Sequence, residues 1–552
     1  MVALGAWYYT PSRHRSLSTD MIKHVVGSKI LKKEQVLISI FLIAILVLSS
    51  GSMVVFAKSN THIVLPNGHD DTTDIQAALN ACVGAGPWCT VQLLKGNYYI
   101  TSQITVYGFQ GSFVGAGQGL TTITVPSGTS FPSPGAAYNM PCTLVTPTPT
   151  TGPECIPDTG SAFGVGLPGP SNPWPVMFTF FGGVFTISGM TITDPNSVAV
   201  SPGYYYYQDP SYTLWTSLYA AVFITGGTPD QPRASAAIDH VTVLGASGDF
   251  EGTNIQSAIL YGGTVPQPGA NNLDDDVLLP GTFSVTNSLF EGVATGPWAF
   301  AAVGATVTVC YNTFTNDPGP ATGFDDVSNT KLTFCGNQFP TAVPYNDIDG
   351  FQGFDHPMPL LPSTIYITNN NAQVGEGGSA VGLIDLGPTN FGNPDFLNAV
   401  VSGNTFQNSY PVESSWYYSV IYSLSLKSTI VSLNNIAGGG QPGIYLNGGP
   451  GTIIGNRIAG ASTGIWLDAV SGVQVAGNIV TNSLMSGIAL TDFNYGGFGT
   501  TPSSNNMITG NSVHNSGACT ATQGCDLWWD GLGTGNVFHW NFCTTSQPSG
   551  LC

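Results

Sequence analysis

The sequence predicts an all-β parallel β-helix, a solenoid in which each coil of the chain adds one rung. A six-residue phrase recurs from residue 285 onward, with an apolar residue, two variable residues, Asn, one variable residue and usually a second apolar residue. Its Asn positions lie 22 to 34 residues apart, which is a repeat length typical of solenoids. With 70 Gly, 38 Pro and only 8% charged residues, the composition excludes a coiled coil or a helical bundle.

The first 57 residues differ in kind from the rest of the chain. Lysines precede an apolar run at Val36–Leu48, and small residues lead to Val55-Phe56-Ala57. This order predicts a secretory signal over residues 1–57, with Met21 as an alternative start, and hence an extracellular protein. The alternative is that residues 36–56 stay uncleaved as a membrane anchor, since this stretch has about the length that spans a bilayer.

The remainder divides into three regions. Residues 58–126 are expected to form an N-terminal cap and the first rungs, with a short helix from Asp71 to about Cys82 that begins at an Asp or Thr N-cap and covers the open end of the solenoid. Residues 127–218 carry further rungs and long insertions, because 126–180 and 195–218 are rich in Pro, Gly, Ser and Tyr. Residues 219–552 form the main repeats and a C-terminal end closed by disulfides.

The recurring Asn has a physical role in this architecture. Amides stacked at a rung corner hydrogen-bond along the column, and Asn tolerates the left-handed backbone that a corner needs. Weaker rungs precede the column at Ile187–Ile192 and Ile238–Val243. The predicted column consists of Ser288 as a substitute, followed by Asn312, Asn337, Asn370, Asn404, Asn434, Asn456, Asn478, Asn511 and Asn541.

All ten cysteines follow residue 57, and an even number in an oxidising compartment indicates disulfides. Cys310 and Cys335 each follow the first apolar residue of their phrase. They are therefore expected on adjacent rungs, at a separation that a disulfide can bridge. Proximity in the sequence predicts the other pairs, which are Cys82 with Cys89, Cys142 with Cys155, Cys519 with Cys525, and Cys543 with Cys552.

The front of the chain resembles the pectate-lyase superfamily of right-handed parallel β-helices. The similarity rests on the Asp71-Thr72-Thr73-Asp74 helix start and on the Gly-rich rung Val114–Val125. It implies a right-handed solenoid and is weak for chemistry, because unrelated functions share such scaffolds. The Arg base of pectate lyases and the Gly-His-Gly and Arg-x-Lys motifs of polygalacturonases have no counterpart here, although Asp325-Asp326 looks like the polygalacturonase Asp pair.

Acidic residues supply the candidate chemistry. Asp325, Asp326, Asp349 and Asp385 follow the Asn phrases by 12 to 15 residues, so consecutive rungs are expected to present carboxylates at one end of the same strand. Paired carboxylates are the acid and base of glycosidases, and crowding raises the pKa of one of them. Two other interpretations remain: the Asp residues cap turns, or their oxygens bind calcium. No cofactor is otherwise expected.

Aromatic residues beside the acids suit the binding of sugar rings, although they equally suit packing against one another. The predicted substrate-binding residues are Trp416, Tyr417, Tyr445, Trp466, Asp468 and Trp528. With 12 Lys+Arg against 31 Asp+Glu, for a formal net charge of −19, the chain excludes a nucleic-acid partner and disfavours polyanionic substrates. The histidines show no metal-ligand spacing.

The sequence therefore predicts a secreted carbohydrate-active protein that degrades a neutral or weakly charged polysaccharide with paired Asp residues, as a glycoside hydrolase or a lyase. The alternative is a non-catalytic, adhesive β-helix that binds cell-surface glycans through its aromatic residues. The distinguishing feature is whether the Asp side chains converge, because an adhesin does not need them together. The sequence does not specify an oligomeric state.

Overall fold

The computed structural model describes residues 60–127, 142–145, 154–157, 176–196, 218–226, 234–245, 255–262, 281–300, 302–317, 319–325, 327–343, 346–352, 361–375, 378–385, 397–408, 419–495, 502–519 and 524–552. The predicted signal or anchor segment, most of the predicted insertions, and the candidate residues Asp326, Trp416 and Tyr417 lie outside these ranges. No helix among the described residues is long and apolar enough to cross a membrane.

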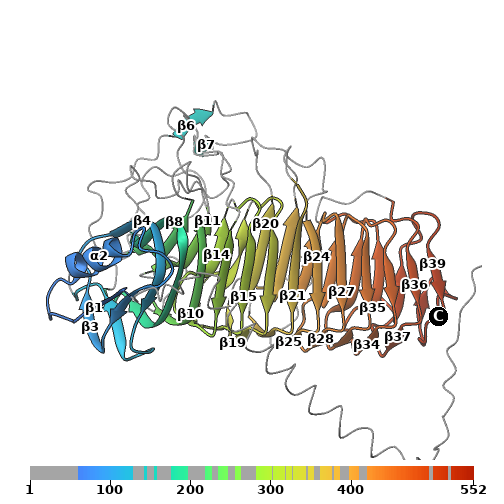
Figure 1. Ribbon diagram of the computed structural model, residues 1–552. Helices are drawn as coiled ribbons and strands as arrows, with labels where there is room; N and C mark the ends of the chain where they lie inside the picture. Colours follow the sequence, from blue (N-terminus) through green and yellow to red (C-terminus); the bar gives the residue numbers. More distant parts are fainter. Residues whose placement is uncertain are drawn as a thin grey trace, which may run out of the picture. The chain divides into compact units, whose positions relative to one another are not determined.

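The described chain coils into three stacks of parallel strands around one apolar interior, which confirms the predicted parallel β-helix (Figure 1). The long strands β4 (Ile104–Val114), β8 (Val176–Thr193) and β10 (Ala234–Leu244) each turn a corner and belong to more than one stack.

Apart from these, the first stack holds β1 (Asn60–Val64), β2 (Cys89–Leu93), β12 (Thr282–Thr286), β15 (Thr306–Cys310), β18 (Lys331–Cys335), β21 (Ser363–Thr368), β24 (Leu397–Ser402), β27 (Ser428–Ser432), β30 (Gly451–Ile454), β33 (Gln474–Ala476), β36 (Met507–Thr509) and β39 (Val537–His539). The second holds β3 (Gly96–Tyr99), β5 (Thr121–Thr124), β13 (Leu289–Glu291), β16 (Thr313–Thr315), β19 (Gln338–Val343), β22 (Asn371–Val374), β25 (Thr405–Asn408), β28 (Asn435–Ala437), β31 (Arg457–Ala459), β34 (Ile479–Thr481) and β37 (Ser512–His514).

The third stack carries the candidate site. It holds β9 (Leu218–Thr225), β11 (Ile255–Gly262), β14 (Thr295–Phe300), β17 (Thr322–Asp325), β20 (Ile348–Gln352), β23 (Val381–Asp385), β26 (Ile421–Leu424), β29 (Ile444–Asn447), β32 (Thr463–Asp468), β35 (Ser486–Thr491), β38 (Leu527–Trp529) and β40 (Ser546–Gln547). A separate antiparallel pair is formed by β6 (Cys142–Val145) and β7 (Glu154–Pro157). Because β8 begins at Val176, the end of the predicted 126–180 insertion is wrong: its apolar run Val176–Phe181 is buried as strand.

The asparagine column is confirmed. Asn434 Oδ1 accepts the backbone N–H of Asn404 at 3.0 Å and its amide Nδ2–H at 2.9 Å. Asn404 Nδ2 also donates to the carbonyl of Ile367 at 2.9 Å. The same bonds repeat on each rung from Asn312 to Asn511, and Ser288 joins the column as the predicted substitute. The column therefore satisfies buried polar groups at one corner over nine intervals of the chain.

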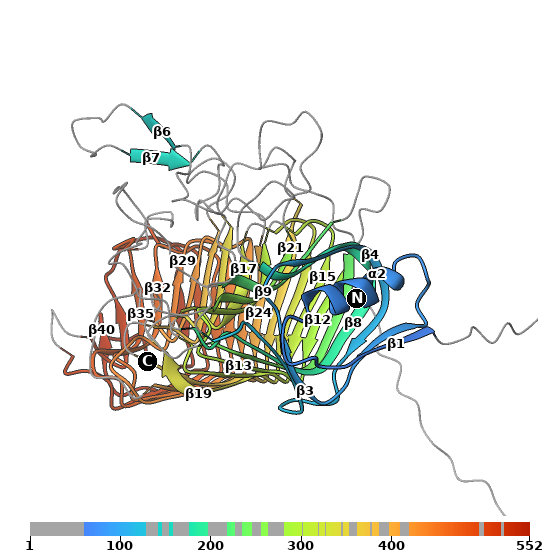
Figure 2. The same cartoon turned by 90° about the vertical axis from the view of Figure 1, so that its left-hand side faces the viewer.

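The predicted capping helix is α2 (Thr72–Ala81), which packs its Ile75, Ala78 and Leu79 onto the first rungs (Figure 2). The expected side-chain cap is absent at its N-terminus. The carboxylate of Asp71 instead accepts the backbone N–H groups of Asn67 and Tyr99, each at 2.9 Å. Asp71 therefore ties the helix start to β3 through the backbone N–H of Tyr99.

Four predicted disulfides are confirmed, namely Cys82–Cys89, Cys310–Cys335, Cys519–Cys525 and Cys543–Cys552. Cys310 and Cys335 are register partners on β15 and β18, and their Cα atoms are 4.5 Å apart. Cys142 and Cys155 lie on the paired strands β6 and β7, and their disulfide stays a prediction.

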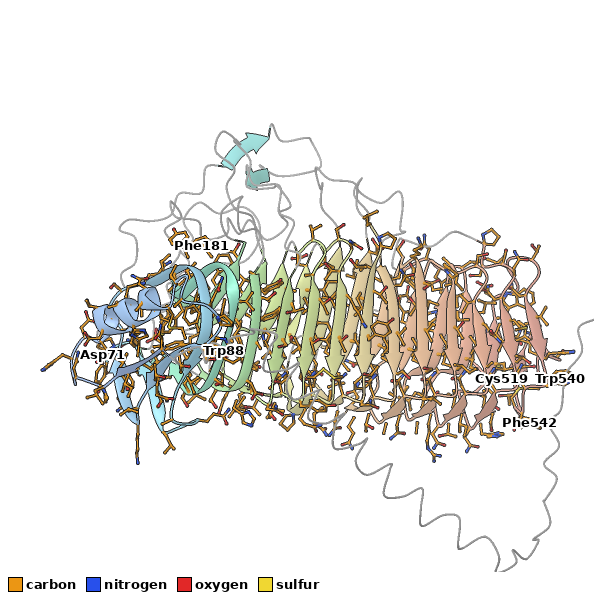
Figure 3. All side chains as sticks on the ribbon, viewed as in Figure 1. Asp71, Trp88, Phe181, Cys519, Trp540 and Phe542 are labelled. Carbon is orange, nitrogen blue, oxygen red and sulfur yellow. A yellow bond between two sulfur atoms is a disulfide. The ribbon has the colours of Figure 1, made fainter. Side chains whose placement is uncertain are left out.

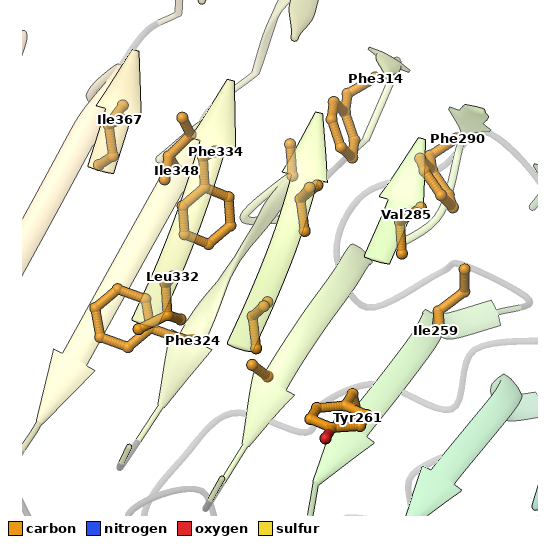
Figure 4. Packing of buried hydrophobic residues seen from close by; sticks show 14 of the residues in the cluster. Ile259, Tyr261, Val285, Phe290, Phe314, Phe324, Leu332, Phe334, Ile348 and Ile367 are labelled. Carbon is orange, nitrogen blue, oxygen red and sulfur yellow. The ribbon is translucent and has the colours of Figure 1, made fainter. Parts of the chain in front are cut away.

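The interior is packed by side chains that stack from rung to rung (Figure 4). Phe314 lies between Phe290 and Phe339, with ring centroids 5.2 and 4.9 Å away. Tyr261 stacks on Phe283 at 4.6 Å. Burial of these rings stabilises the solenoid.

Candidate functional site

The outward side of the third stack carries the candidate site. Every second residue of its strands joins the apolar interior, as Phe324, Leu383 and Leu467 do. Side chains alternate along a strand, so the intervening residues point outward. Register pairing places ten of these in one line, which we call the outer row: Leu260, Trp298, Gly323, Asp349, Gly382, Tyr422, Tyr445, Trp466, Ala489 and Trp528.

Asp349 lies in the outer row between two glycines. A Cβ on Gly323 would lie 2.9 Å from the ring of Trp298, and one on Gly382 would lie 2.6 Å from the amide nitrogen of Asn346. Both glycines are therefore needed, because larger residues would displace the groups beside Asp349. The carboxyl group thus has Trp298 on one side and Tyr422 with Asn346 on the other.

The environment of Asp349 favours the protonated acid. Its side chain keeps partial contact with solvent, but desolvation by the surrounding protein raises its pKa to about 6. Asn346 Nδ2 donates to Asp349 Oδ1 at 2.8 Å and opposes part of this rise. The same nitrogen lies 2.9 Å from the hydroxyl of Tyr422, so one amide orients both groups. A carboxyl group with a pKa near 6 suits general acid catalysis close to neutral pH.

Asp325 is the other candidate acid that the described residues place on the face of Asp349. It lies on β17, two residues beyond the register partner of Asp349, and both side chains point outward. Strand spacing and rise place their Cβ atoms roughly 8 Å apart. Asp325 is fully buried. The two acids therefore form a diagonal pair on neighbouring rungs, not the directly stacked pair that the sequence spacing predicts.

The prediction of a single column of carboxylates is wrong, because the acids occupy different register positions on their strands. Asp385 is the last residue of β23 and lies one residue beyond the row of Asp325, so its side chain leaves the face that holds Asp349. Its Oδ2 accepts the backbone N–H of Leu397 at 3.0 Å, at the start of β24. Variable loops between Asn phrase and third strand shift the acids along the strands, which a fixed count of residues does not capture.

Asp468 and Tyr445 lie together on the outward side of the third stack, but both are covered by other residues and are fully buried. Tyr445 is fully buried, and its hydroxyl donates to Asp468 Oδ2 at 2.8 Å. Asp468 also accepts the Thr491 hydroxyl and the backbone N–H groups of Asn494 and Tyr495, each at 2.8 Å. Its carboxylate holds the loop after β35. Trp466 and Trp528 remain partly exposed in the outer row.

Sequence reasoning missed Trp298, Asn346 and Tyr422 beside Asp349, and Phe493 and Tyr495 near Trp528. An alignment of the alternating apolar residues in the third-stack strands, rung by rung, would have placed the first group beside Asp349. The distance from the Asn phrase varies too much to do so.

The described residues bring few potential metal ligands together. Of the candidate acids that the structure describes, Asp325 and Asp349 share one face, and two carboxylates fall short of the six to eight oxygens that calcium takes. The described chain contains one group of potential ligands close enough to share an ion, His62, Cys82 and Cys89, and its cysteines form a disulfide. None of the described basic residues Lys95, Lys331, Lys427 and Arg457 lies on a third-stack strand.

Comparisons with known proteins support the architecture. Residues 362–531 match the family model described as "Right handed beta helix region", and this part of the chain is a right-handed parallel β-helix. The chain has no match among curated proteins.

Solved structures with the same general architecture share little sequence with the chain. The A-module of a mannuronan C-5 epimerase from Azotobacter vinelandii is 13% identical, with 87% of this chain and 93% of that chain covered and a TM-score of 0.32. A mannuronic acid-specific polysaccharide family 6 lyase from human gut microbiota is 10% identical, with 88% and 87% covered and a TM-score of 0.43. The catalytic domain of a GH87 α-1,3-glucanase is 10% identical, with 88% and 66% covered and a TM-score of 0.38. Such values say nothing about the chemistry of this chain.

Proposed function

We propose that the protein is a secreted glycoside hydrolase that cleaves a neutral or weakly charged polysaccharide, with Asp349 as the general acid and Asp325 as its partner carboxylate. The observation that carries the proposal is Asp349 itself. It is a partly exposed carboxyl group with a pKa raised to about 6, oriented by Asn346 and set in a row of aromatic residues.

The roughly 8 Å between the Cβ atoms of the two acids is compatible with hydrolysis with inversion. Carboxyl groups 6.5–9.5 Å apart leave room for a water molecule between the base and the sugar. In this scheme Asp349 gives its proton to the glycosidic oxygen as the bond to the leaving sugar breaks. Asp325, whose carboxylate is buried in the free protein, must become accessible in the substrate complex to take a proton from the water whose oxygen forms the new bond to the anomeric carbon. The lack of described Lys or Arg on these strands supports an uncharged substrate.

The test is a screen of the mature protein on neutral and anionic polysaccharides, assayed for new reducing ends and for unsaturated products. Asp349→Asn should lower the release of reducing ends by about 10²- to 10⁴-fold and keep the wild-type unfolding midpoint. Asp74→Asn, an exposed carboxylate on α2, is the matched control and should keep full activity. Unsaturated products would show that the protein is a lyase and not a hydrolase. Full activity of Asp349→Asn would refute the role of Asp349 as the general acid.

A second candidate is a glycan-binding protein without catalysis. The specific observation in its favour is the group of partly exposed aromatic residues at the C-terminal rungs, far from Asp349. Glycan binding without turnover of any polysaccharide, unchanged in Asp349→Asn, would select this function.

A further inference from the structure

The apolar interior of the solenoid is covered differently at its two ends. At the N-terminal end α2 packs onto it, and Ile75 and Leu79 are fully buried. Among the described residues, three hydrophobic side chains that pack against this interior are only partly buried, and all three lie at the C-terminal end: Trp529, Phe538 and Cys543. The rings of Trp529 and Phe538 contact each other, with centroids 5.8 Å apart. The described chain therefore leaves its interior incompletely covered at the C-terminal end.

The last rung also exposes large apolar side chains. Trp540 and Phe542 are 77% and 69% exposed, and Figure 3 shows both at the end of the solenoid opposite α2. Leu532 and Val537 are exposed as well. Because a Trp or Phe side chain carries about 150–250 Å² of surface, Trp540 and Phe542 alone leave roughly 300 Å² of apolar surface in water. This equals the largest apolar patch on many monomeric proteins, and such patches often have a function.

Trp540 occupies a corner position at which other bulky side chains cover the following rung. Tyr311, Leu433 and Trp540 each precede an Asn of the column, and their φ values are +61°, +56° and +52°. A Cβ on Gly336 would lie 2.7 Å from the ring of Tyr311, and one on Gly455 would lie 3.1 Å from the side chain of Leu433. Both bulky side chains therefore lie against the corner of the next rung. Trp540 is on the last rung that the structure describes, so the rung that follows it would belong to another chain.

The last strand of the first stack also has an open edge among the described residues. β39 pairs with β36, where the Val537 N–H donates to the Asn506 carbonyl at 2.8 Å and the His539 carbonyl accepts the Gly510 N–H at 3.0 Å. Backbone groups of successive strand residues point to opposite sides, so the N–H and C=O of Phe538 point away from β36. An edge of this kind is ready to pair with another strand.

Charge and symmetry favour a second copy of the chain at this end. The chain has a formal net charge of −19, but residues 531–552 contain no Asp, Glu, Lys or Arg. Two copies therefore repel each other less here than at the N-terminal end, where Asp70, Asp71 and Asp74 lie at the start of α2. A twofold axis at Phe538 sets two β39 strands antiparallel, so that each Phe538 donates its N–H to the Phe538 carbonyl of the other copy.

We propose that the last rung, residues 531–543, is a dimer interface at which two copies of the chain join end to end about a twofold axis. The paired β39 strands continue the first stack across the axis, and the two Phe538 rings cover the end of both interiors. Trp540 and Phe542 pack against the second copy. The interface does not depend on the proposed function, because Asp349 lies on β20 and not on the last rung.

Sedimentation velocity of the mature protein at pH 7.5, over about 0.5 to 50 µM, tests the proposal. The weight-average mass should rise from that of one chain to that of two. Trp540→Asn suits the left-handed backbone at this position, and Phe542→Ser copies its register partner Ser512. Each variant should raise the dissociation constant by about tenfold or more, and neither should lower the unfolding midpoint of the dilute monomer.

Two exposed residues away from the last rung provide matched controls. Leu433→Asn changes a side chain that is 68% exposed and has the same left-handed backbone as Trp540, but at the corner of an inner rung. Trp88→Ala removes a ring that is 66% exposed in the N-terminal part of the solenoid (Figure 3). Both variants should dimerise like the wild-type protein. Hydrogen exchange supplies a readout without mutation, since the Phe538 amide should exchange more slowly at the highest protein concentration than at the lowest.

A single-chain mass at every concentration would overturn the proposal, as would a dimer whose affinity is unchanged in both Trp540→Asn and Phe542→Ser. Growth beyond two chains would also overturn it, because it indicates head-to-tail joining without a twofold axis. A dimer that hydrolyses no polysaccharide would leave the interface standing and refute the proposed function, so the two failures are distinguishable.

Discussion

Asp349 illustrates how a single side chain acquires a proton-donor character from its surroundings. Withdrawal of water raises its pKa to about 6, while one hydrogen bond from Asn346 acts in the opposite direction. Desolvation outweighs the two hydrogen bonds that lower the pKa, one from the Asn346 side chain and one from the Gly350 backbone, because protein atoms surround the carboxyl group. The same amide contacts the Tyr422 hydroxyl, so the orientation of the acid depends on the next rungs of the row.

The pH profile of activity tests this balance. The protonated form of Asp349 is the active one, so activity should be present below pH 6 and decline as pH rises through about 6. Asn346→Ala removes a bond that stabilises the carboxylate. It should therefore raise the pKa further and shift the alkaline limb of kcat to higher pH. Asn97→Ala, at an exposed position of β3, should leave the profile unchanged. A shift to lower pH in Asn346→Ala would contradict the assignment.

At the scale of the strands, two kinds of position hold the solenoid together. The asparagine column satisfies backbone groups at one corner, and each amide bonds to both neighbouring rungs. In the third stack, by contrast, glycines beside Asp349 leave space for larger neighbours. The first kind of position governs stability, whereas the second governs the shape of the site.

Asn434→Ala tests the column. It removes the acceptor of the Asn404 N–H and the donor to the Val401 carbonyl, both of which are buried. The free energy of unfolding should fall by about 2–3 kcal/mol. Asn97→Ala should change it by less than about 0.5 kcal/mol. Urea denaturation of the two variants provides the measurement, and equal midpoints would show that the column adds no stability.

Gly382→Ala tests the space beside Asp349. The new methyl group would meet the Tyr422 hydroxyl and the Asn346 amide, so both must move. The variant should lose about tenfold or more in kcat/KM and about 1–3 kcal/mol of stability. Gly451→Ala on β30 is the matched control, because its methyl group would lie 2.9 Å from the Leu446 side chain, away from the site. It should lose stability but keep activity, and activity lost equally in both would refute the role of Gly382.

The whole molecule combines few basic residues with several buried acids. Burial raises the pKa of Asp317 and Asp347 well above the ordinary value of 3.8, and Asp347 is raised further by its proximity to Asp317. Asp349 and Asp530 shift in the same direction. Hydrogen bonds lower the pKa of Asp70 and Asp239, but these two groups are largely solvated and contribute less. Taken together, these pKa shifts stabilise the folded protein more at acidic pH than at neutral pH.

The stability of the protein should therefore increase on acidification. A carboxyl group whose folded pKa lies above 3.8 stabilises the fold fully below pH 3.8, and this contribution is lost as pH rises through its folded pKa. The urea midpoint should be higher at pH 4.5 than at pH 7. Asp317→Asn with Asp347→Asn should flatten this dependence, because the amide pair stays neutral at both pH values. A maximum near neutral pH in the wild-type protein would contradict the prediction.

The sequence by itself determined the parallel β-helix, the asparagine column, α2 and four disulfides. Each of these depends on a local pattern: the six-residue phrase repeats on every rung, and Cys310 and Cys335 hold equivalent positions in it. The end of the predicted 126–180 insertion was wrong because an apolar run followed a stretch rich in Pro and Gly.

Only the tertiary structure decided which acids share a face. Asp325 and Asp349 lie diagonally on neighbouring strands of one face, whereas the side chain of Asp385 points away from that face. The carboxylate of Asp468 accepts hydrogen bonds from the backbone of the loop that carries Phe493 and Tyr495. The physical reason is that loops of unequal length separate the Asn phrase from the third strand, and a shift by one residue moves a side chain to the opposite face of a sheet. Periodicity therefore fixes the core of a solenoid, whereas the contents of its outer rows depend on the register of each rung.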